Sequence, residues 1–225
     1  MARRIIVGLA VLFLAGLSAI GGTALAANED VELTIPVVKG AVVGKPFKVD
    51  RAFGQQNDLR VRAPFSSYVP VSKEFETQVV NAPKPGNAYI KFNFTTPDNQ
   101  PLENVQFIEM TIPMTRRRDR LRMAARLLGG DGFKMAVTGR EKVHRDYVRA
   151  RTIGPYDAVE VIGRYEDPTL GLIFVRLVGI LNPVDKDGVF AVANIVASKV
   201  PINSPEDLAN TRSGVVISKL TYLRR

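Results

Sequence analysis

The chain of 225 residues has no cysteine, no tryptophan and a single histidine. Without cysteine there can be no disulfide, thiol nucleophile, zinc–thiolate site, iron–sulfur cluster or cysteine-linked lipid. One imidazole is also too few for a metal site built on two or three histidines. Neither glycine-rich phosphate-binding motif, Gly-x-Gly-x-x-Gly or Gly-x4-Gly-Lys-Ser/Thr, occurs in the sequence. We therefore expect neither a metal nor a cofactor.

Acidic residues are outnumbered. The chain has 31 Lys and Arg against 22 Asp and Glu, which gives a formal net charge of +9. Its 46% hydrophobic and 24% charged residues are typical of a folded domain and not of a disordered or fibrous chain. A strongly cationic surface is not expected as the partner of such a protein.

The start of the chain predicts export. Two arginines precede an uncharged, mostly apolar stretch at residues 5–27, and the small residues Ala24 and Ala26 suit a signal peptidase. We predict a signal peptide over residues 1–26, cleavage after Ala26, and a periplasmic location. The mature chain keeps a net charge of +7. An uncleaved membrane anchor is the alternative, because about 20 apolar residues can span a bilayer.

Residues 27–86 are rich in proline and glycine. Only Val31–Ile35 alternates between apolar and polar residues, as a half-buried strand does. We interpret this region as an extended arm with one or two edge strands, and Ala63–Pro70 as its linker.

From residue 87 onward the patterns are clearer. Ala88–Phe94 alternates with period two, Pro97–Pro101 has the composition of a turn, and Val105–Ile112 reads as a second strand of the same hairpin. Further strands are predicted at Phe133–Glu141, Val143–Arg151, Asp157–Tyr165, Gly171–Leu181 and Gly188–Ser198. The sequence Asp185–Gly188 predicts the hairpin between the last two, although its first residues also resemble the start of a calcium loop.

Two helices are expected around these strands. Thr115 is the predicted N-cap of the first, which carries apolar residues at helical spacing up to Leu128 and stops at Gly129-Gly130. The second begins with the capping pattern at Ser204-Pro205 and ends at Ser213 or Ser218. The β-branched residues 215–217 leave open a closing strand in place of its second half.

The predicted class is α+β: an antiparallel sheet with helices packed on one face, over residues 87–225, preceded by the extended N-terminal arm. This order of elements, together with the ending Ser204–Arg225, resembles the PsbP-like fold, which includes DcrB-like periplasmic proteins. The resemblance covers residues 87–225 and contains no diagnostic motif. It implies a non-enzymatic accessory or binding protein of an exported compartment, and it transfers no site residue.

His144 is the first candidate for catalysis. Asp146 or Glu141 could orient its ring, but the neighbouring Lys142 and Arg145 disfavour an imidazolium, so we expect no catalytic role. Four carboxylates are a second candidate, for glycoside cleavage. They are Asp157, Glu160, Glu166 and Asp167. We interpret Glu160 as a solvated residue on the polar face of its strand.

Arginines gather at the start of the first helix, where the helix dipole disfavours cations. They are Arg116, Arg117, Arg118, Arg120, Arg122 and Arg126. Residues 116–151 contain twelve basic and four acidic residues, so their net charge of +8 exceeds that of the whole mature chain. These arginines predict a face that contacts anionic phospholipid headgroups, an anionic envelope polymer or an acidic protein. An ordinary solvated helix face is the other interpretation.

Nucleic acid is a poor candidate, because the basic segment lacks interleaved aromatic residues and the predicted leader removes the chain from the cytoplasm. The sequence favours a non-catalytic, exported envelope accessory or binding protein with no catalytic residues. One alternative is a secreted hydrolase that uses carboxylates or His144. Another is a peripheral inner-membrane protein held by an uncleaved leader. The oligomeric state does not follow from the sequence.

Overall fold

The computed structural model describes residues 29–38, 42–82 and 88–224. The predicted signal peptide, residues 1–26, lies outside the described residues. Within those described ranges, no helix has the length and apolar character that a membrane span requires.

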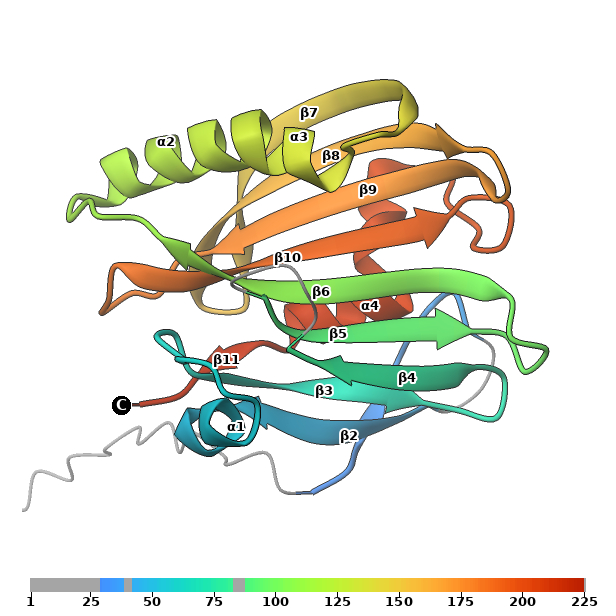
Figure 1. Cartoon of the computed structure of the whole chain (residues 1–225), viewed down its shortest axis with the longest axis horizontal. Helices are drawn as coiled ribbons and strands as arrows, with labels where there is room; N and C mark the ends of the chain where they lie inside the picture. Colours follow the sequence, from blue (N-terminus) through green and yellow to red (C-terminus); the bar gives the residue numbers. More distant parts are fainter. Residues whose placement is uncertain (1–28, 39–41, 83–87, 225) are drawn as a thin grey trace, which may run out of the picture.

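A seven-stranded antiparallel sheet forms the centre of the molecule, with strand order β4-β5-β6-β10-β9-β8-β7 (Figure 1). Its strands are β4 (Glu76–Asn81), β5 (Ala88–Thr95), β6 (Pro101–Thr111), β7 (Glu141–Ile153), β8 (Tyr156–Asp167), β9 (Gly171–Ile180) and β10 (Asp187–Val196). Both predicted hairpins are confirmed, since β5 pairs with β6 and β9 with β10. The polar residues at 185 and 187 belong to the second hairpin.

A smaller sheet has the order β1-β2-β3-β11. It comprises β1 (Val31–Leu33), β2 (Val42–Val49), β3 (Phe65–Val71) and β11 (Thr221–Tyr222), and the short helix α1 (Arg51–Gln56) follows β2. The linker predicted at Ala63–Pro70 is wrong, because most of that segment is β3. Phe65 and Val69 are buried, and this burial holds the segment in the sheet despite its prolines.

The back face of the large sheet packs against the small sheet and the C-terminal helices. The rings of Phe47 and Phe92 lie 4.7 Å apart, and those of Phe65 and Phe107 lie 5.2 Å apart. The second predicted helix is confirmed in two pieces, the 3-10 turn η2 (Pro205–Ala209) and helix α4 (Arg212–Ser218). The alternative closing strand is wrong, because residues 215–217 are helical and pack into this core.

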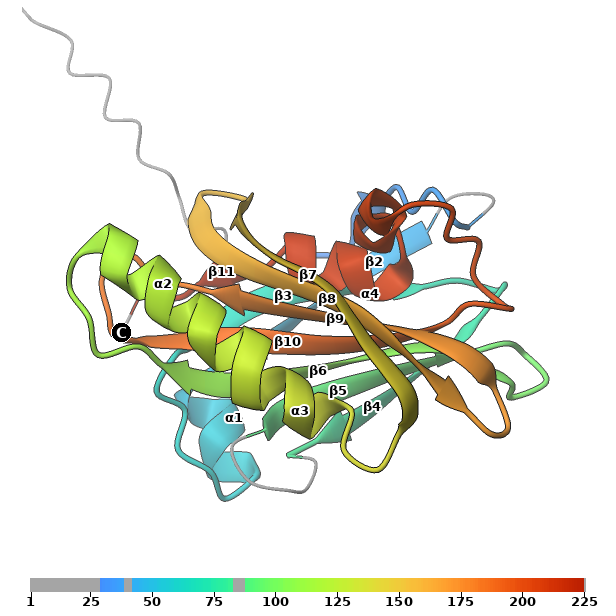
Figure 2. The ribbon, with the colours of Figure 1, turned by 90° about the horizontal axis from the view of Figure 1, so that it is seen from above.

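The first predicted helix lies on the opposite, front face (Figure 2). It consists of α2 (Arg117–Leu127), a π-helical turn η1 (Leu128–Gly132) and α3 (Phe133–Ala136). The buried side chains of Ala124 and Leu128 pack in one cluster with those of strands β8 and β9. Antiparallel sheets with a few helices confirm the predicted α+β class. The prediction that the helices pack on one face is wrong, because α2 and α3 lie on the front of the large sheet and α4 lies on its back.

Three predictions for this helix are wrong. The N-cap is Arg116 and not Thr115, and its side chain makes no capping hydrogen bond. Gly129-Gly130 does not end the helix, because it lies within the π-helical turn and lets Val148 of β7 approach closely. A Cβ atom on Gly129 would lie 3.0 Å from that valine. The strand predicted from Phe133 is α3 and a turn, since burial of Phe133 keeps the helix on the sheet.

Candidate functional site

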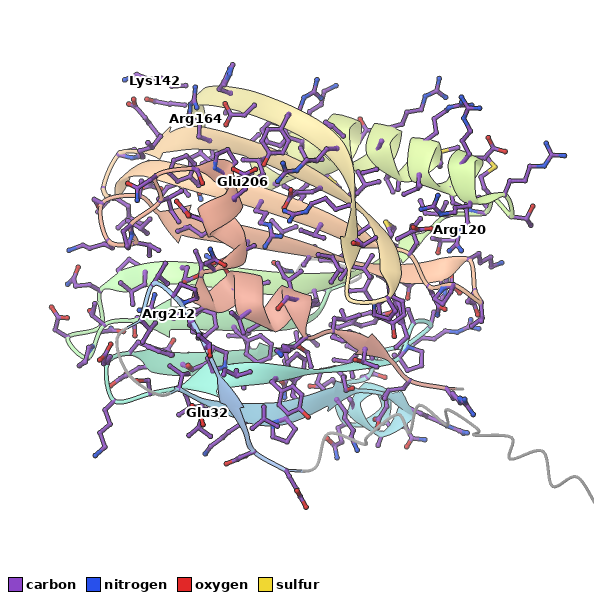
Figure 3. All side chains as sticks on the ribbon, turned by 180° about the vertical axis from the view of Figure 1, so that it is seen from behind. Glu32, Arg120, Lys142, Arg164, Glu206 and Arg212 are labelled. Carbon is purple, nitrogen blue, oxygen red and sulfur yellow. The ribbon has the colours of Figure 1, made fainter. Side chains whose placement is uncertain are left out.

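Two of the six predicted arginines on α2 bind to the body of the protein. Arg117 donates two hydrogen bonds of 2.7 Å to the carboxylate of Asp157 on β8. Arg120 donates to the backbone oxygen of Asp185 at 2.7 Å (labelled in Figure 3). Both contacts fix the start of α2 against the sheet, at the beginning of β8 and at the connection between β9 and β10.

The other arginines project into solvent. Arg118, Arg122 and Arg126 follow one another at four-residue spacing, and we call these three residues the arginine stripe. All three are exposed. Arg122 lies 3.7 Å from Asp119, whereas Arg118 and Arg126 have no ion-pair partner among the described residues. The exposed Arg116 at the N-cap likewise lacks a partner in the described part of the chain, so the start of α2 carries positive charge that the fold does not neutralise.

Apolar side chains are exposed in the same layer. Leu127, next to the last arginine of the stripe, is 39% exposed, and Met135 on α3 is 68% exposed. Val148 of β7 is 36% exposed and lies against Gly129 of η1. Arg145 of β7 donates a hydrogen bond to the backbone oxygen of the same glycine. The helix layer and β7 therefore form one continuous surface that combines arginine with apolar groups.

Arg117 and most of the basic residues that follow α2 in the segment 116–151 are paired with acids. Their partners are the four carboxylates of β8 that were candidates for glycoside cleavage. The pairs are Arg117–Asp157 at 2.7 Å, Arg149–Glu160 at 2.8 Å, Arg151–Glu160 at 3.0 Å, Lys142–Glu166 at 2.5 Å and Arg140–Asp167 at 2.9 Å. The segment's large positive charge is thus partly neutralised by strand β8, and each of these carboxylates is engaged by a basic side chain.

Glu160 is buried, so its interpretation as a solvated residue is wrong. Its side chain is 0% exposed, because β8 is an interior strand whose back face lies beneath η2. It accepts hydrogen bonds from Arg149, Arg151 and the buried Arg176, the last at 2.8 Å. Arg176 also donates to the backbone oxygen of Leu208 in η2. This cluster joins strands β7, β8 and β9 to the C-terminal segment.

The pKa of Glu160 is set by opposing effects. Burial raises the pKa of the Glu160 carboxyl group. The charge of Arg176 and the hydrogen bonds from Arg149, Arg176 and Arg151 lower the pKa by more than burial raises it. The net result is a pKa of Glu160 below its ordinary value. Glu160 is therefore an ionised structural residue, and its cluster accounts for three of the chain's arginines.

His144 lies at the surface, with its side chain 59% exposed. Its Nε2 atom is 3.3 Å from Asp146, as the sequence allowed, but the same carboxylate also contacts Arg164 at 2.9 Å (labelled in Figure 3). In the described part of the chain, no serine hydroxyl is hydrogen bonded to His144.

Among the residues that the structure places, no group of three or more His, Asp or Glu side chains could hold a metal ion. A cavity of about 990 Å³ lies elsewhere, between α1, the segment 58–64 and the C-terminal Leu223. The arginine stripe does not line it.

No family model and no curated protein matches the chain. Among solved structures, it is similar to the solution structure of cyanobacterial PsbP (CyanoP) from Synechocystis sp. PCC 6803. That match has 13% identity and a TM-score of 0.49, and it covers 79% of this chain and 92% of the other. PsbP also gives its name to the fold that the order of elements in the sequence resembles.

Two other solved structures are similar at comparable levels. LpqN of Mycobacterium tuberculosis, described as involved in cell envelope biogenesis, has 13% identity and a TM-score of 0.45 over 87% of this chain and 91% of its own. The Ran-binding protein Mog1p of Saccharomyces cerevisiae has 10% identity and a TM-score of 0.38 over 79% and 95%. At these identities the likeness concerns the fold alone.

Proposed function

We propose that this is a non-catalytic exported protein that binds an anionic membrane surface through the arginine stripe of α2. The observation that carries the proposal is the separation of the basic residues into two groups. Those facing β8 are paired with its carboxylates, whereas Arg118 and Arg126 have no partner among the described residues. Unpaired arginines on one exposed helix face are available to an external anion.

Lipid headgroups fit this surface better than an acidic protein or a soluble polymer. The stripe extends over about 12 Å of the helix. Leu127 and Met135 are exposed in the same helix layer, and such apolar groups can enter the boundary between headgroups and acyl chains. Arginine near an anionic leaflet contributes electrostatic attraction, and the apolar side chains add affinity that salt does not screen.

Sedimentation with vesicles tests the proposal. The purified protein should bind vesicles of phosphatidylglycerol and phosphatidylcholine, bind phosphatidylcholine alone much more weakly, and lose affinity as salt rises. Replacing the whole stripe by glutamine (Arg118→Gln, Arg122→Gln, Arg126→Gln) should weaken binding about a hundredfold, given the usual contribution of a basic residue near an anionic surface.

A matched variant removes the same charge elsewhere. Arg60, Lys73 and Lys199 are exposed residues outside the helix layer, and their replacement by glutamine should change vesicle binding much less. Equal losses in the two triple variants would show that only net charge matters and would contradict a docking role for α2. Absence of binding to either vesicle would reject the proposal altogether.

Export is the second part of the proposal, and it is tested separately. Intact-mass spectrometry of the protein recovered from the periplasmic fraction should show a chain that begins at Ala27. A chain that retains Met1 would indicate a membrane anchor, and recovery from the cytosol would contradict export.

A further inference from the structure

Four side-chain amides form a row across the front face of the large sheet. Gln78 on β4 pairs with Asn93 on β5, and Asn93 pairs with Asn104 on β6. Asn104 in turn pairs with Asn194 on β10. Neighbouring strands lie about 4.8 Å apart, so the row spans roughly 14 Å. We call these four residues the amide row.

Sheet stability does not explain this row. Asparagine is depleted in β-strands, yet three asparagines stand side by side on adjacent strands. The next residues along the same strands, Phe92, Val105 and Ile195, point to the back face and are buried in the core. The strands therefore pack against the core through their back face, and the amides lie on the front face.

The amide row forms the floor of a groove of about 380 Å³. One wall is made by Tyr165, Leu170 and Ile173, from the end of the β8–β9 hairpin, and by Arg140, whose guanidinium lies 5.1 Å from the centre of the Tyr165 ring. Figure 1 shows α2 and α3 at the β7–β8 end of this face, away from the fronts of β4, β5 and β6. The groove is thus an open site between the helix layer and the far edge of the sheet.

Much of the hydrogen-bonding capacity in the groove is unused. Asn194 donates to Asn104 at 3.2 Å and accepts from the Tyr165 hydroxyl at 3.4 Å. The carboxamides of Gln78 and Asn93 have no hydrogen-bond partner among the residues described.

We infer that the groove binds a neutral, hydroxyl-rich saccharide chain. Each carboxamide offers donors and an acceptor side by side, which suits the paired hydroxyls of a sugar ring. Leu170 and Ile173 provide an apolar wall for the ring's C–H face. The groove carries little net charge, because its lining contains two basic residues, Lys91 and Arg140, and two acidic residues, Glu103 and Asp167. Asp167 pairs with Arg140 at 2.9 Å, and Glu103 pairs with Arg212 at 3.0 Å.

A peptide is less suited to the groove. Strands β5, β6 and β10, which carry the three asparagines, already pair with neighbours on both sides, so a peptide could add a strand only beside the edge strand β4 and not over the groove floor. An anionic polymer would find only Lys91 and the already paired Arg140. The site is separate from the arginine stripe, and its occupation does not depend on membrane binding.

Side-chain amide signals test the inference directly. The ¹⁵N-labelled protein is titrated with cellotetraose, chitotetraose, maltotetraose and laminaritetraose, and with a hyaluronan tetrasaccharide as the anionic comparison. At least one neutral saccharide should shift the NH₂ signals of Asn93 and Asn104 in a saturable manner. If no neutral saccharide shifts them, or if the anionic one binds more tightly, the inference is overturned.

Substitutions then locate the binding. Asn93→Ala and Gln78→Ala should each weaken the saccharide's affinity, the former about tenfold, because each removes hydrogen bonds to the ligand. Gln78 is exposed, so its replacement leaves the fold intact. Gln100→Ala, in the exposed β5–β6 turn, is the matched control and should leave the affinity unchanged. Unchanged affinity in both row variants would contradict the assignment, whereas vesicle binding should be the same in all three.

Discussion

The arginine stripe of α2 and the two arginines of β7 that bind Glu160 belong to one basic segment of the chain, yet the first group is exposed and the second is paired with a buried acid. On α2, the arginine stripe is exposed, and the one ion pair that it makes with the described residues is the contact of 3.7 Å between Arg122 and Asp119. On β7, Arg149 and Arg151 both bind the buried carboxylate of Glu160. The difference shows that a local excess of charge in sequence becomes available charge only where the neighbouring element in space supplies no acid.

The largest expected effect on stability comes from removing the charge of Glu160, which binds two arginines of β7. Glu160→Gln leaves the buried guanidinium of Arg176 without a counter-charge and should lower the free energy of unfolding by about 3–5 kcal/mol. Urea denaturation followed by circular dichroism measures this. Glu206→Gln removes an exposed partner of the same Arg149 and serves as the control, with an effect near zero. Equal effects of the two substitutions would contradict a structural role for the buried cluster.

Lowering the pH should weaken the cluster of Glu160 and its arginines. The pKa of Glu160 is lower in the folded protein than its ordinary value of 4.5, so its contribution to stability is complete above that pH. The contribution is lost as pH falls through the folded-state pKa. The stability difference between the wild type and Glu160→Gln should therefore be constant near neutrality and shrink below about pH 4.5. A difference that grows on acidification would show that the carboxyl is protonated in the native state.

A smaller effect is expected from the β7 side of the cluster. Arg151→Gln removes two hydrogen bonds of 3.0 Å to Glu160 and should cost about 1.5 kcal/mol of stability. Vesicle affinity should stay at the wild-type value, because this arginine is already engaged. A clear loss of vesicle affinity in this stable variant would remove the distinction between the two groups of arginines.

The smallest effect concerns the uncapped start of α2. Arg116 occupies the N-cap with extended backbone angles and no capping hydrogen bond. Arg116→Ser supplies a capping oxygen and removes a cation from the positive end of the dipole, so the free energy of unfolding should rise by about 0.5–1 kcal/mol. Thermal denaturation measures the gain. A destabilised variant would mean that Arg116 makes a contact that supports the fold.

The strands that alternate strictly could be predicted from the sequence, because the alternation directly reflects burial of one face. The helix layer was harder to predict from the sequence. Gly129 has the composition of a helix stop, but its role is to let Val148 approach, which depends on a strand that comes later in the chain. The second half of the C-terminal helix was also ambiguous, since residues 215–217 favour strands and become helical only through burial.

The partners of Glu103 and Glu160 could not be predicted from the sequence, because each partner is brought to its carboxylate by the fold. Glu103 of β6 accepts hydrogen bonds from the backbone N–H groups of Arg212 and Ser213 and so stabilises the start of α4 from a remote part of the chain. Glu160 binds Arg149 across two paired strands, at positions that the register places opposite each other. The exposed stripe on α2 could be predicted, because its spacing is local.

A fluorescent label in the lipid-contacting layer tests the central claim most directly. The chain has no cysteine, so Leu127→Cys on α2 and Val79→Cys on β4, at the opposite edge of the large sheet, each give a single labelling site with the stripe intact. On anionic vesicles that contain brominated lipid, the label at Leu127→Cys should be quenched and the label at Val79→Cys should not. Equal quenching at the two sites, or quenching at Val79→Cys alone, would contradict docking through α2.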